Sequence, residues 1–136
     1  GHNIAAPLQD ALVSWRDSSG GPVRYIFKGE NPYTEQFSIF EGFDDSWPDT
    51  AFNRDLYSRL AGAAAVTFAG EALSHCVEAS VTSYIKRCGS VPGGQDVFIL
   101  SDCSSPVAGF DREASKERLA ALGVNFIAST FETNEA

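Results

Sequence analysis

The first part of the chain places apolar side chains at the spacing of an amphipathic helix. Apolar residues recur three or four positions apart, at Ile4, Leu8, Leu12 and Trp15. Pro7 is tolerated in a first helical turn, and a run of serines and glycines farther on ends the pattern. The pattern therefore predicts a helix that begins near Ile4 and ends before that run.

Two later segments have the composition of strands. Residues 23–27 are rich in β-branched and aromatic side chains, and Lys28 follows them directly. Residues 63–69 are apolar apart from Thr67, as in strands that helices cover on both faces. We therefore expect a short strand that ends at Lys28 and a central strand over residues 63–69.

The rest of the chain alternates between the two patterns. Asp49 or Thr50 is expected to cap a helix that runs to Arg59, and residues 34–40 are compatible with one or two helical turns. Further helices are predicted at residues 73–87 and 112–122, and further strands at residues 97–101 and 124–129. Helix and strand thus alternate along the whole chain.

This alternation predicts an α/β fold in which right-handed crossovers join parallel strands. We expect a single domain over residues 1–136, built as a three-layer α/β/α, Rossmann-like structure with a mostly parallel sheet. Such sheets usually open on a strand, whereas this chain opens on a helix. Ligands bind at the carboxyl ends of parallel strands, and Lys28, residues 70–76 and Asp102 each follow a predicted strand there.

Composition and charge exclude several classes of protein. The chain has 136 residues, of which 43% are hydrophobic and 21% charged, as in a packed globular domain. A formal net charge of −8 repels phosphate backbones and anionic membrane surfaces, so neither nucleic acid nor a membrane is an expected partner. No apolar run approaches the roughly 20 residues that span a bilayer.

The cysteines indicate a reducing compartment. Cys76, Cys88 and Cys103 are odd in number, and no two have the spacing of a zinc or redox motif. We therefore expect reduced thiols and a cytoplasmic protein.

One of these thiols has a position that favours chemistry. Cys76 lies near the start of the helix after the apolar strand, where backbone amides and the helix dipole favour a thiolate and can hold an oxyanion. A cation at Lys28 would stabilise that thiolate. The alternatives are a small buried Cys76 and a solvated Lys28. His75 is interpreted as a packing or pocket-wall residue, because adjacent helical side chains point about 100° apart.

Three segments carry motifs of one known family. In residues 68–80 these are Gly70 and Cys76 followed by Val77, and the other two segments are residues 25–38, which include Lys28 and the loop after it, and residues 100–110. Together they resemble the isochorismatase-like cysteine hydrolases, the superfamily that contains nicotinamidase. Residues 68–80 resemble the family's nucleophile segment, although Ser74 and His75 replace the usual polar pair. Residues 25–38 resemble the catalytic-lysine strand and its loop, and residues 100–110 a later strand and loop of the nicotinamidase-like branch.

The resemblance implies a cysteine-dependent amidohydrolase that acts on a small, nicotinamide-like amide through a thioester. Cys76 would be the nucleophile, and Lys28 would stabilise its thiolate. The backbone amides of Ala72 and Cys76 would line the oxyanion hole, and the Glu71–Ala72 peptide bond would be cis. His75, Tyr33 and Phe37 are the candidate pocket residues.

The resemblance also implies parts that this chain lacks. In the family, an aspartate at the end of a first strand is the general base, and an aspartate and two histidines before the first helix bind metal. His2 falls after those ligands, and Asp102 is interpreted as a loop brace. No metal or other cofactor is therefore expected in this chain, and zinc only if the missing N-terminal segment is supplied. We expect a homo-oligomer or association with that missing fragment.

Two other functions stay open at this point. A noncatalytic interaction domain would keep the fold but lack the catalytic aspartate and the metal ligands. A flavodoxin-like or nucleotide-binding domain is disfavoured, because no glycine-rich phosphate loop follows any predicted strand.

Overall fold

The computed structural model describes residues 4–19, 21–44, 46–87 and 94–130. Four helices and three strands follow one another along these residues: α1 (Ala6–Ser19), α2 (Arg54–Ala61), β1 (Ala65–Phe68), α3 (Glu78–Lys86), β2 (Asp96–Leu100), α4 (Arg112–Ala120) and β3 (Asn125–Ile127). A 3₁₀ turn at Pro48–Thr50 precedes α2, and a π-helical turn at Leu73–Val77 leads into α3.

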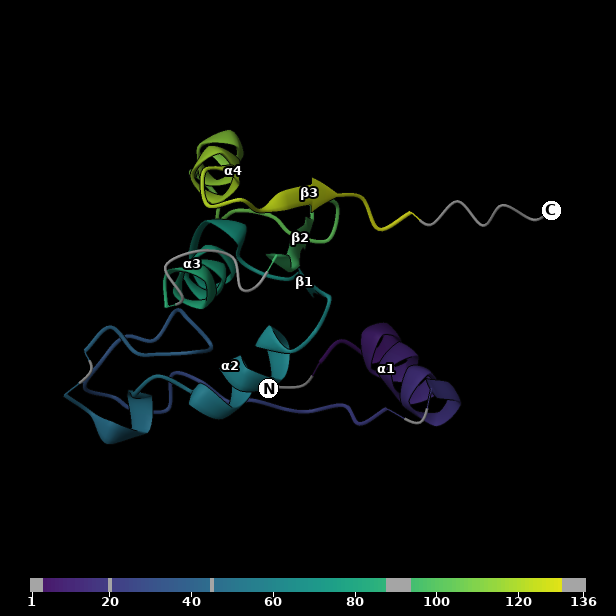
Figure 1. Cartoon of the computed structure of the whole chain (residues 1–136), viewed down its shortest axis with the longest axis horizontal. Helices are drawn as coiled ribbons and strands as arrows, with labels where there is room; N and C mark the ends of the chain where they lie inside the picture. The colour runs from purple at the N-terminus through teal and green to yellow at the C-terminus, as the bar shows by residue number, and fades with distance from the viewer. Residues whose placement is uncertain (1–3, 20, 45, 88–93, 131–136) are drawn as a thin grey trace.

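The three strands form a parallel sheet in the order β1-β2-β3. Val66 pairs with Val97, and Ile99 pairs with Phe126. Helix α3 connects β1 to β2 and α4 connects β2 to β3, so two right-handed crossovers step in the same direction and place both helices on one face. Figure 1 shows α3 and α4 together on one side of the sheet, with α1 apart on the other side.

The core lies between this face of the sheet and helices α3 and α4. It is formed by fully or nearly fully buried side chains, among them Val66, Val97, Ile99, Val81, Tyr84 and Leu119. Burial raises the pKa of Tyr84, although a hydrogen bond to Gln95 opposes the shift. Gln95 accepts the Tyr84 hydroxyl and donates to the carbonyls of Leu60 and Ala63, so this buried polar pair is satisfied.

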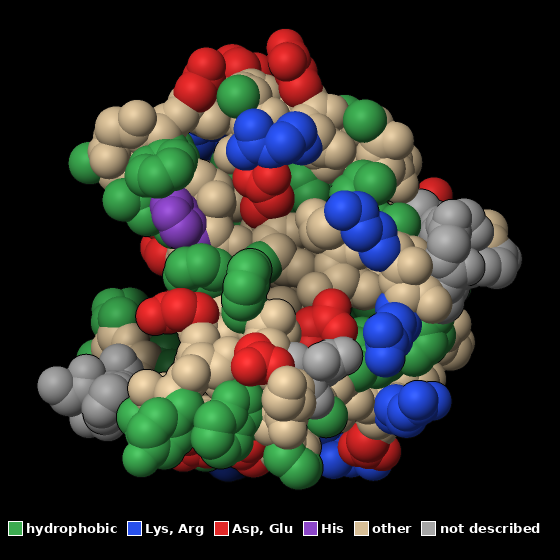
Figure 2. All heavy atoms as spheres, turned by 90° about the vertical axis from the view of Figure 1, so that its left-hand side faces the viewer, with side chains coloured by type: hydrophobic (Ala, Val, Ile, Leu, Met, Phe, Trp, Pro, Cys, Tyr) green, Lys and Arg blue, Asp and Glu red, His purple; other side chains and the backbone are tan. Residues whose placement is uncertain are grey.

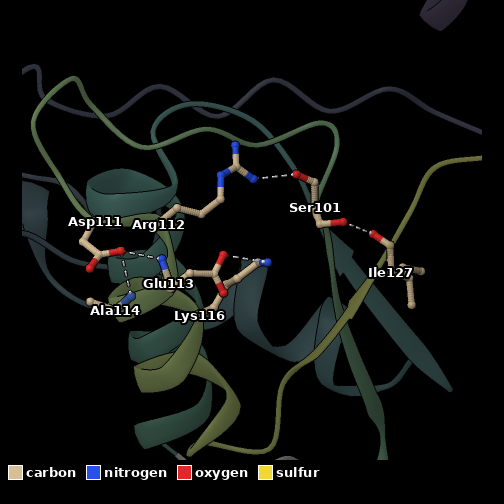
Figure 3. A network of polar contacts seen from close by, with 7 residues as sticks. All are labelled: Ser101, Asp111, Arg112, Glu113, Ala114, Lys116 and Ile127. Carbon is tan, nitrogen blue, oxygen red and sulfur yellow. Dashed lines mark hydrogen bonds and ion pairs between the residues drawn. The ribbon is translucent and has the colours of Figure 1, made fainter.

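Polar contacts join the end of β2 to the start of α4 (Figure 3). The Asp111 carboxylate accepts the Glu113 amide at 2.8 Å and so caps α4. Arg112 donates to the Ser101 carbonyl at 2.9 Å, and the Ser101 hydroxyl donates to the Ile127 carbonyl at 3.0 Å. These bonds fix the loop that leaves the carboxyl end of β2.

The structure confirms the α/β class, the parallel sheet and most of the predicted elements. The helix predicted to begin near Ile4 is α1, which runs on to Ser19 and so includes two of the serines expected to stop it. The predicted helices at residues 73–87 and 112–122 correspond to the π-helical turn with α3 and to α4. The predicted strands at residues 97–101 and 124–129 correspond to β2 and β3, each with shorter bounds.

The predicted strand at residues 23–27 is wrong. This segment has no regular secondary structure, and within the described residues no strand pairs with it. Its apolar side chains stay exposed: Tyr25 is 56% and Phe27 74% accessible. Composition favours a strand only where a neighbour supplies the hydrogen bonds, and composition does not specify that neighbour.

The prediction that residues 63–69 form a central strand is also wrong. Strand β1 spans Ala65–Phe68 and lies at the edge of the described sheet, where Ala65 and Thr67 are exposed. An apolar run therefore predicts a strand correctly without predicting what covers it.

Two smaller expectations differ from the structure. Helix α2 is capped by Asn53, whose side chain accepts the Leu56 amide at 3.0 Å, and neither Asp49 nor Thr50 caps it. Residues 34–40 are not helical. There the Ser38 hydroxyl accepts the Phe40 amide at 3.0 Å, a local bond that competes with helix formation.

Helix α1 is amphipathic but buries none of its residues. Leu8 and Trp15, on its apolar face, are 56% and 51% exposed. No helix in the described ranges combines the length and apolarity needed to cross a membrane.

Candidate active site

Lys28 and Cys76 meet although they lie 48 positions apart in the sequence. The Lys28 Nζ is 3.4 Å from the Cys76 Sγ and 3.1 Å from the Gln36 carbonyl oxygen. Both side chains are partly buried, so water screens their interaction only in part. An ammonium at this distance attracts a thiolate and so favours a nucleophilic sulfur.

Cys76 belongs to the π-helical turn Leu73–Val77, which follows β1 after a short connection. Gly70 has a φ of 124°, a conformation that glycine adopts readily and that a side chain would strain. The peptide bond between Glu71 and Ala72 is cis. The resemblance implied a cis bond at this place.

The loop after β2 holds the segment before Cys76. The Gly70 amide donates to the Cys103 carbonyl at 3.0 Å, and the Leu73 amide donates to the Ser105 carbonyl at 2.7 Å. The Ser105 hydroxyl donates to the Glu71 carboxylate at 2.7 Å. The position of the turn is therefore determined by a loop more than 25 residues later in the chain.

The Ala72 carbonyl accepts the amides of His75 and Val77, each at 3.1 Å. The Ala72 amide donates to no protein group within the described part of the chain. A free amide next to a nucleophile suits an oxyanion hole, and the assignment of the Ala72 and Cys76 amides to that role stays a prediction.

Aromatic side chains surround His75. The centroid of its ring lies 5.6 Å from that of Phe37 and 4.5 Å from that of Phe110, and both contacts are edge to face. Its Nδ1 is 2.8 Å from the Ser74 hydroxyl oxygen. Phe37 and Phe110 are 45% and 54% exposed. Figure 2 shows such hydrophobic side chains gathered in groups on one face, with acidic side chains beside them.

Tyr33 lies elsewhere. It stacks on Trp47 at 5.4 Å between ring centroids and is 77% exposed. Of the three candidate pocket residues, the structure therefore brings His75 and Phe37 together and places Tyr33 in a separate aromatic pair.

Two cavities lie near these groups. One of about 230 Å³ is lined by residues that include Lys28, Gln36 and Ile39. The other, of about 450 Å³, is lined by residues that include Phe37 and Phe43. Cys76 does not line either cavity.

Asp102 has a bracing contact. Its carboxylate accepts the Ser129 amide at 2.8 Å and the Ser129 hydroxyl, and these hydrogen bonds hold the pKa of Asp102 below its ordinary value. Cys103, beside it, is an exposed free thiol. Cys88 lies outside the described residues.

The described residues do not fit a metal ion. No three His, Cys, Asp or Glu side chains come together within the described ranges, and His2 lies outside them.

Comparison with known proteins identifies the fold of the chain. No protein-family model and no curated protein sequence matches the chain. Its structure is similar to that of the yeast nicotinamidase Pnc1p, with a TM-score of 0.61, 22% sequence identity, and coverage of 87% of this chain and 50% of that one. The chain has the nicotinamidase fold. Pnc1p bound to the inhibitor nicotinaldehyde gives a TM-score of 0.62 at 22% identity, covering 89% of this chain and 52% of that one. The chain thus spans about half the length of these nicotinamidase chains.

Sequence analysis missed two residues of the site. Ser80 is buried and hydrogen-bonds the Cys76 carbonyl, and Gln36 contacts Lys28 through its backbone carbonyl. The spacing of Ser80, four residues after Cys76, is a signal that could have identified it, because a helical serine often bonds the carbonyl four residues earlier. No pattern in the sequence identifies Gln36, because its contact depends on how its loop folds.

Proposed function

We propose that the chain is the Cys76-containing part of a cysteine hydrolase that cleaves the C–N bond of a small amide. The observation that carries this proposal is the 3.4 Å contact between Lys28 and Cys76. The nicotinamidase fold supports it, because the structural neighbours are enzymes of that activity.

The reaction follows from the chemistry of a thiolate. Cys76 Sγ bonds to the amide carbonyl carbon, and the negative charge moves onto the oxygen, where backbone amides such as that of Ala72 stabilise it. The C–N bond then breaks. The nitrogen leaves as ammonia after taking up, through water, the proton that the thiol lost. Water cleaves the resulting thioester, which gives the acid and returns the thiol.

A flat, aromatic amide of the nicotinamide class suits the surroundings of Cys76. Phe37 and Phe110 contact the ring of His75, which directly precedes Cys76 in the chain, and rings of this kind prefer edge-to-face or offset contact with another ring. The structural neighbour binds nicotinaldehyde, an aromatic molecule of similar size.

The proposed reaction also needs a general base. Within the described residues no carboxylate hydrogen-bonds Cys76, and general acid–base catalysis contributes roughly 10²–10⁴-fold to a rate. We propose that a further polypeptide segment or a second copy supplies an aspartate, and that zinc, where present, binds residues of that segment. The free thiols Cys76 and Cys103 support a reducing, cytoplasmic location.

The test combines ammonia release with protection of the thiol. Iodoacetamide labelling is followed at each cysteine by peptide mass spectrometry, with and without nicotinaldehyde, whose carbonyl adds reversibly to a thiolate. We expect Cys76 to react well before Cys103, and nicotinaldehyde to protect Cys76 alone. Ammonia release from nicotinamide is expected to be lost in Cys76→Ala and kept in the matched variant Cys103→Ala.

The alternative is a noncatalytic interaction domain with the same fold. It is favoured by the lack, within the described residues, of a carboxylate that hydrogen-bonds Cys76. Equal labelling of Cys76 and Cys103, no protection and no ammonia would together support this alternative and contradict the hydrolase.

A further inference from the structure

Ser80 joins two segments that are distant in the sequence. It is buried, with 4% of its surface exposed. Its hydroxyl donates to the Cys76 carbonyl at 2.6 Å and accepts the Ile39 amide at 3.0 Å. One hydroxyl group therefore connects the helical segment that carries Cys76 to the loop at residues 36–40.

That loop holds Lys28. The Gln36 carbonyl accepts the Lys28 ammonium at 3.1 Å, and the Gln36 side-chain oxygen accepts the Gly29 amide at 2.9 Å. Gly29 has a φ of 70°, so the backbone turns sharply directly after Lys28. The location of Gln36 therefore determines where the Lys28 ammonium lies.

The second contact of Ser80 exceeds what a helix requires. A helical serine bonds the carbonyl four residues earlier without help from the rest of the protein. The bond to Ile39 spans 41 positions and contributes nothing to α3 itself. It fixes the distance between the Ile39 loop and the helix, and hence between Lys28 and Cys76.

We infer that Ser80 is a positioning residue, which holds the Lys28 ammonium against the Cys76 sulfur by bridging the Cys76 carbonyl and the Ile39 amide. The inference deepens the proposed function and rests on it for its catalytic meaning. The geometric part concerns the reactivity of a thiol, and that can be measured without any hydrolysis.

The first test compares Ser80→Val with Ser80→Thr. These variants have the same shape, but only threonine keeps the hydroxyl, so any strain from the added methyl group is common to both. We expect Ser80→Val to lower the iodoacetamide rate constant of Cys76 about tenfold relative to Ser80→Thr, the effect of one lost hydrogen bond. Ser83→Ala, on the same helix, is the control and should leave the rate unchanged. Equal rates for the valine and threonine variants would overturn the inference.

The second test asks whether Ser80 acts through Lys28. In a Lys28→Met background the ammonium is absent, so Ser80→Val should have no further effect on labelling of Cys76. If the two substitutions slow labelling additively, Ser80 does not act through Lys28 and the inference fails.

A second pair of variants keeps the inference testable if Ser80→Val does not fold. Gln36→Met removes the oxygen that holds Gly29, whereas Gln36→Glu keeps an acceptor there. We expect slower labelling in the methionine variant only, with far-ultraviolet circular dichroism unchanged in both. If both variants label at the wild-type rate, the loop does not position Lys28. Ammonia release from nicotinamide is measured separately, so loss of activity without a change in labelling contradicts the proposed function and not the inference.

Discussion

At the Cys76 sulfur, the nearest charged group is the ammonium of Lys28. A free cysteine is most often a small buried group, and what distinguishes Cys76 is the ammonium 3.4 Å away. Lys28 in turn donates to the Gln36 carbonyl, and this hydrogen bond holds the ammonium in place. The positive charge is therefore held next to the sulfur by contacts within the chain itself.

Removing that charge should slow the thiol. We expect Lys28→Met to lower the iodoacetamide rate constant of Cys76 about tenfold or more at neutral pH, because it removes the positive charge 3.4 Å from the attacking sulfur. Lys28→Arg keeps the positive charge on a side chain of different shape, so its rate constant for alkylation of Cys76 should lie between those of the wild type and of Lys28→Met. Lys86→Met, at the exposed end of α3, is the matched control. A methionine variant that reacts as fast as the wild type would show that the contact does not activate Cys76.

At the scale of elements, an ion pair links the two helices behind the site. Arg118 of α4 contacts Glu78 of α3 through two bonds, one of them at 2.9 Å. Partial burial alone would raise the pKa of Glu78, but hydrogen bonds from Arg118 and Ser115 and the charge of Arg118 outweigh it, so the pKa lies below its ordinary value of 4.5. The pair thus favours the folded chain while Glu78 is ionised.

The sign of this shift predicts an acid-dependent loss of stability. The stabilisation is fully present above 4.5, the ordinary pKa, and disappears as the pH falls through the lowered pKa of the folded state. We expect Glu78→Gln to reduce the free energy of unfolding by about 1 kcal/mol at neutral pH, with a smaller difference in acid. Urea unfolding at neutral and at acid pH measures the difference in free energy of unfolding between wild type and variant. Glu117→Gln, on the exposed side of α4, is the control. A difference that grows in acid would contradict the assignment.

The comparison of sequence with structure separates local from distant causes. Helix α4 and strand β2 follow from spacing and from short-range signals such as the Asp111 cap. Residues 23–27 have the composition of a strand but no partner in the described sheet, because pairing is a property of two segments and not of one. The site divides in the same way. Position and resemblance predict roles for Cys76 and Lys28, whereas the contact of Gln36 depends on how its loop folds.

At the scale of the whole molecule, apolar surface is left uncovered along one region. Residues 23–27 run as an extended trace away from the sheet (Figure 1), with Tyr25 and Phe27 exposed. In the described residues β1 pairs on one side only, with β2. An unpaired strand edge and exposed aromatic side chains each tend to associate with another polypeptide.

We therefore expect the purified chain to associate through this region. In sedimentation velocity it should form a species larger than its 14.6 kDa monomer, in a concentration-dependent way. Phe27→Ser should shift this equilibrium towards the monomer, because it removes apolar surface that association would bury. Phe43 is 90% exposed, against 74% for Phe27, and lies on a different part of the surface. Phe43→Ser should therefore leave the association equilibrium unchanged. A monomer at all concentrations, with the same behaviour in both variants, would show that this surface needs no partner.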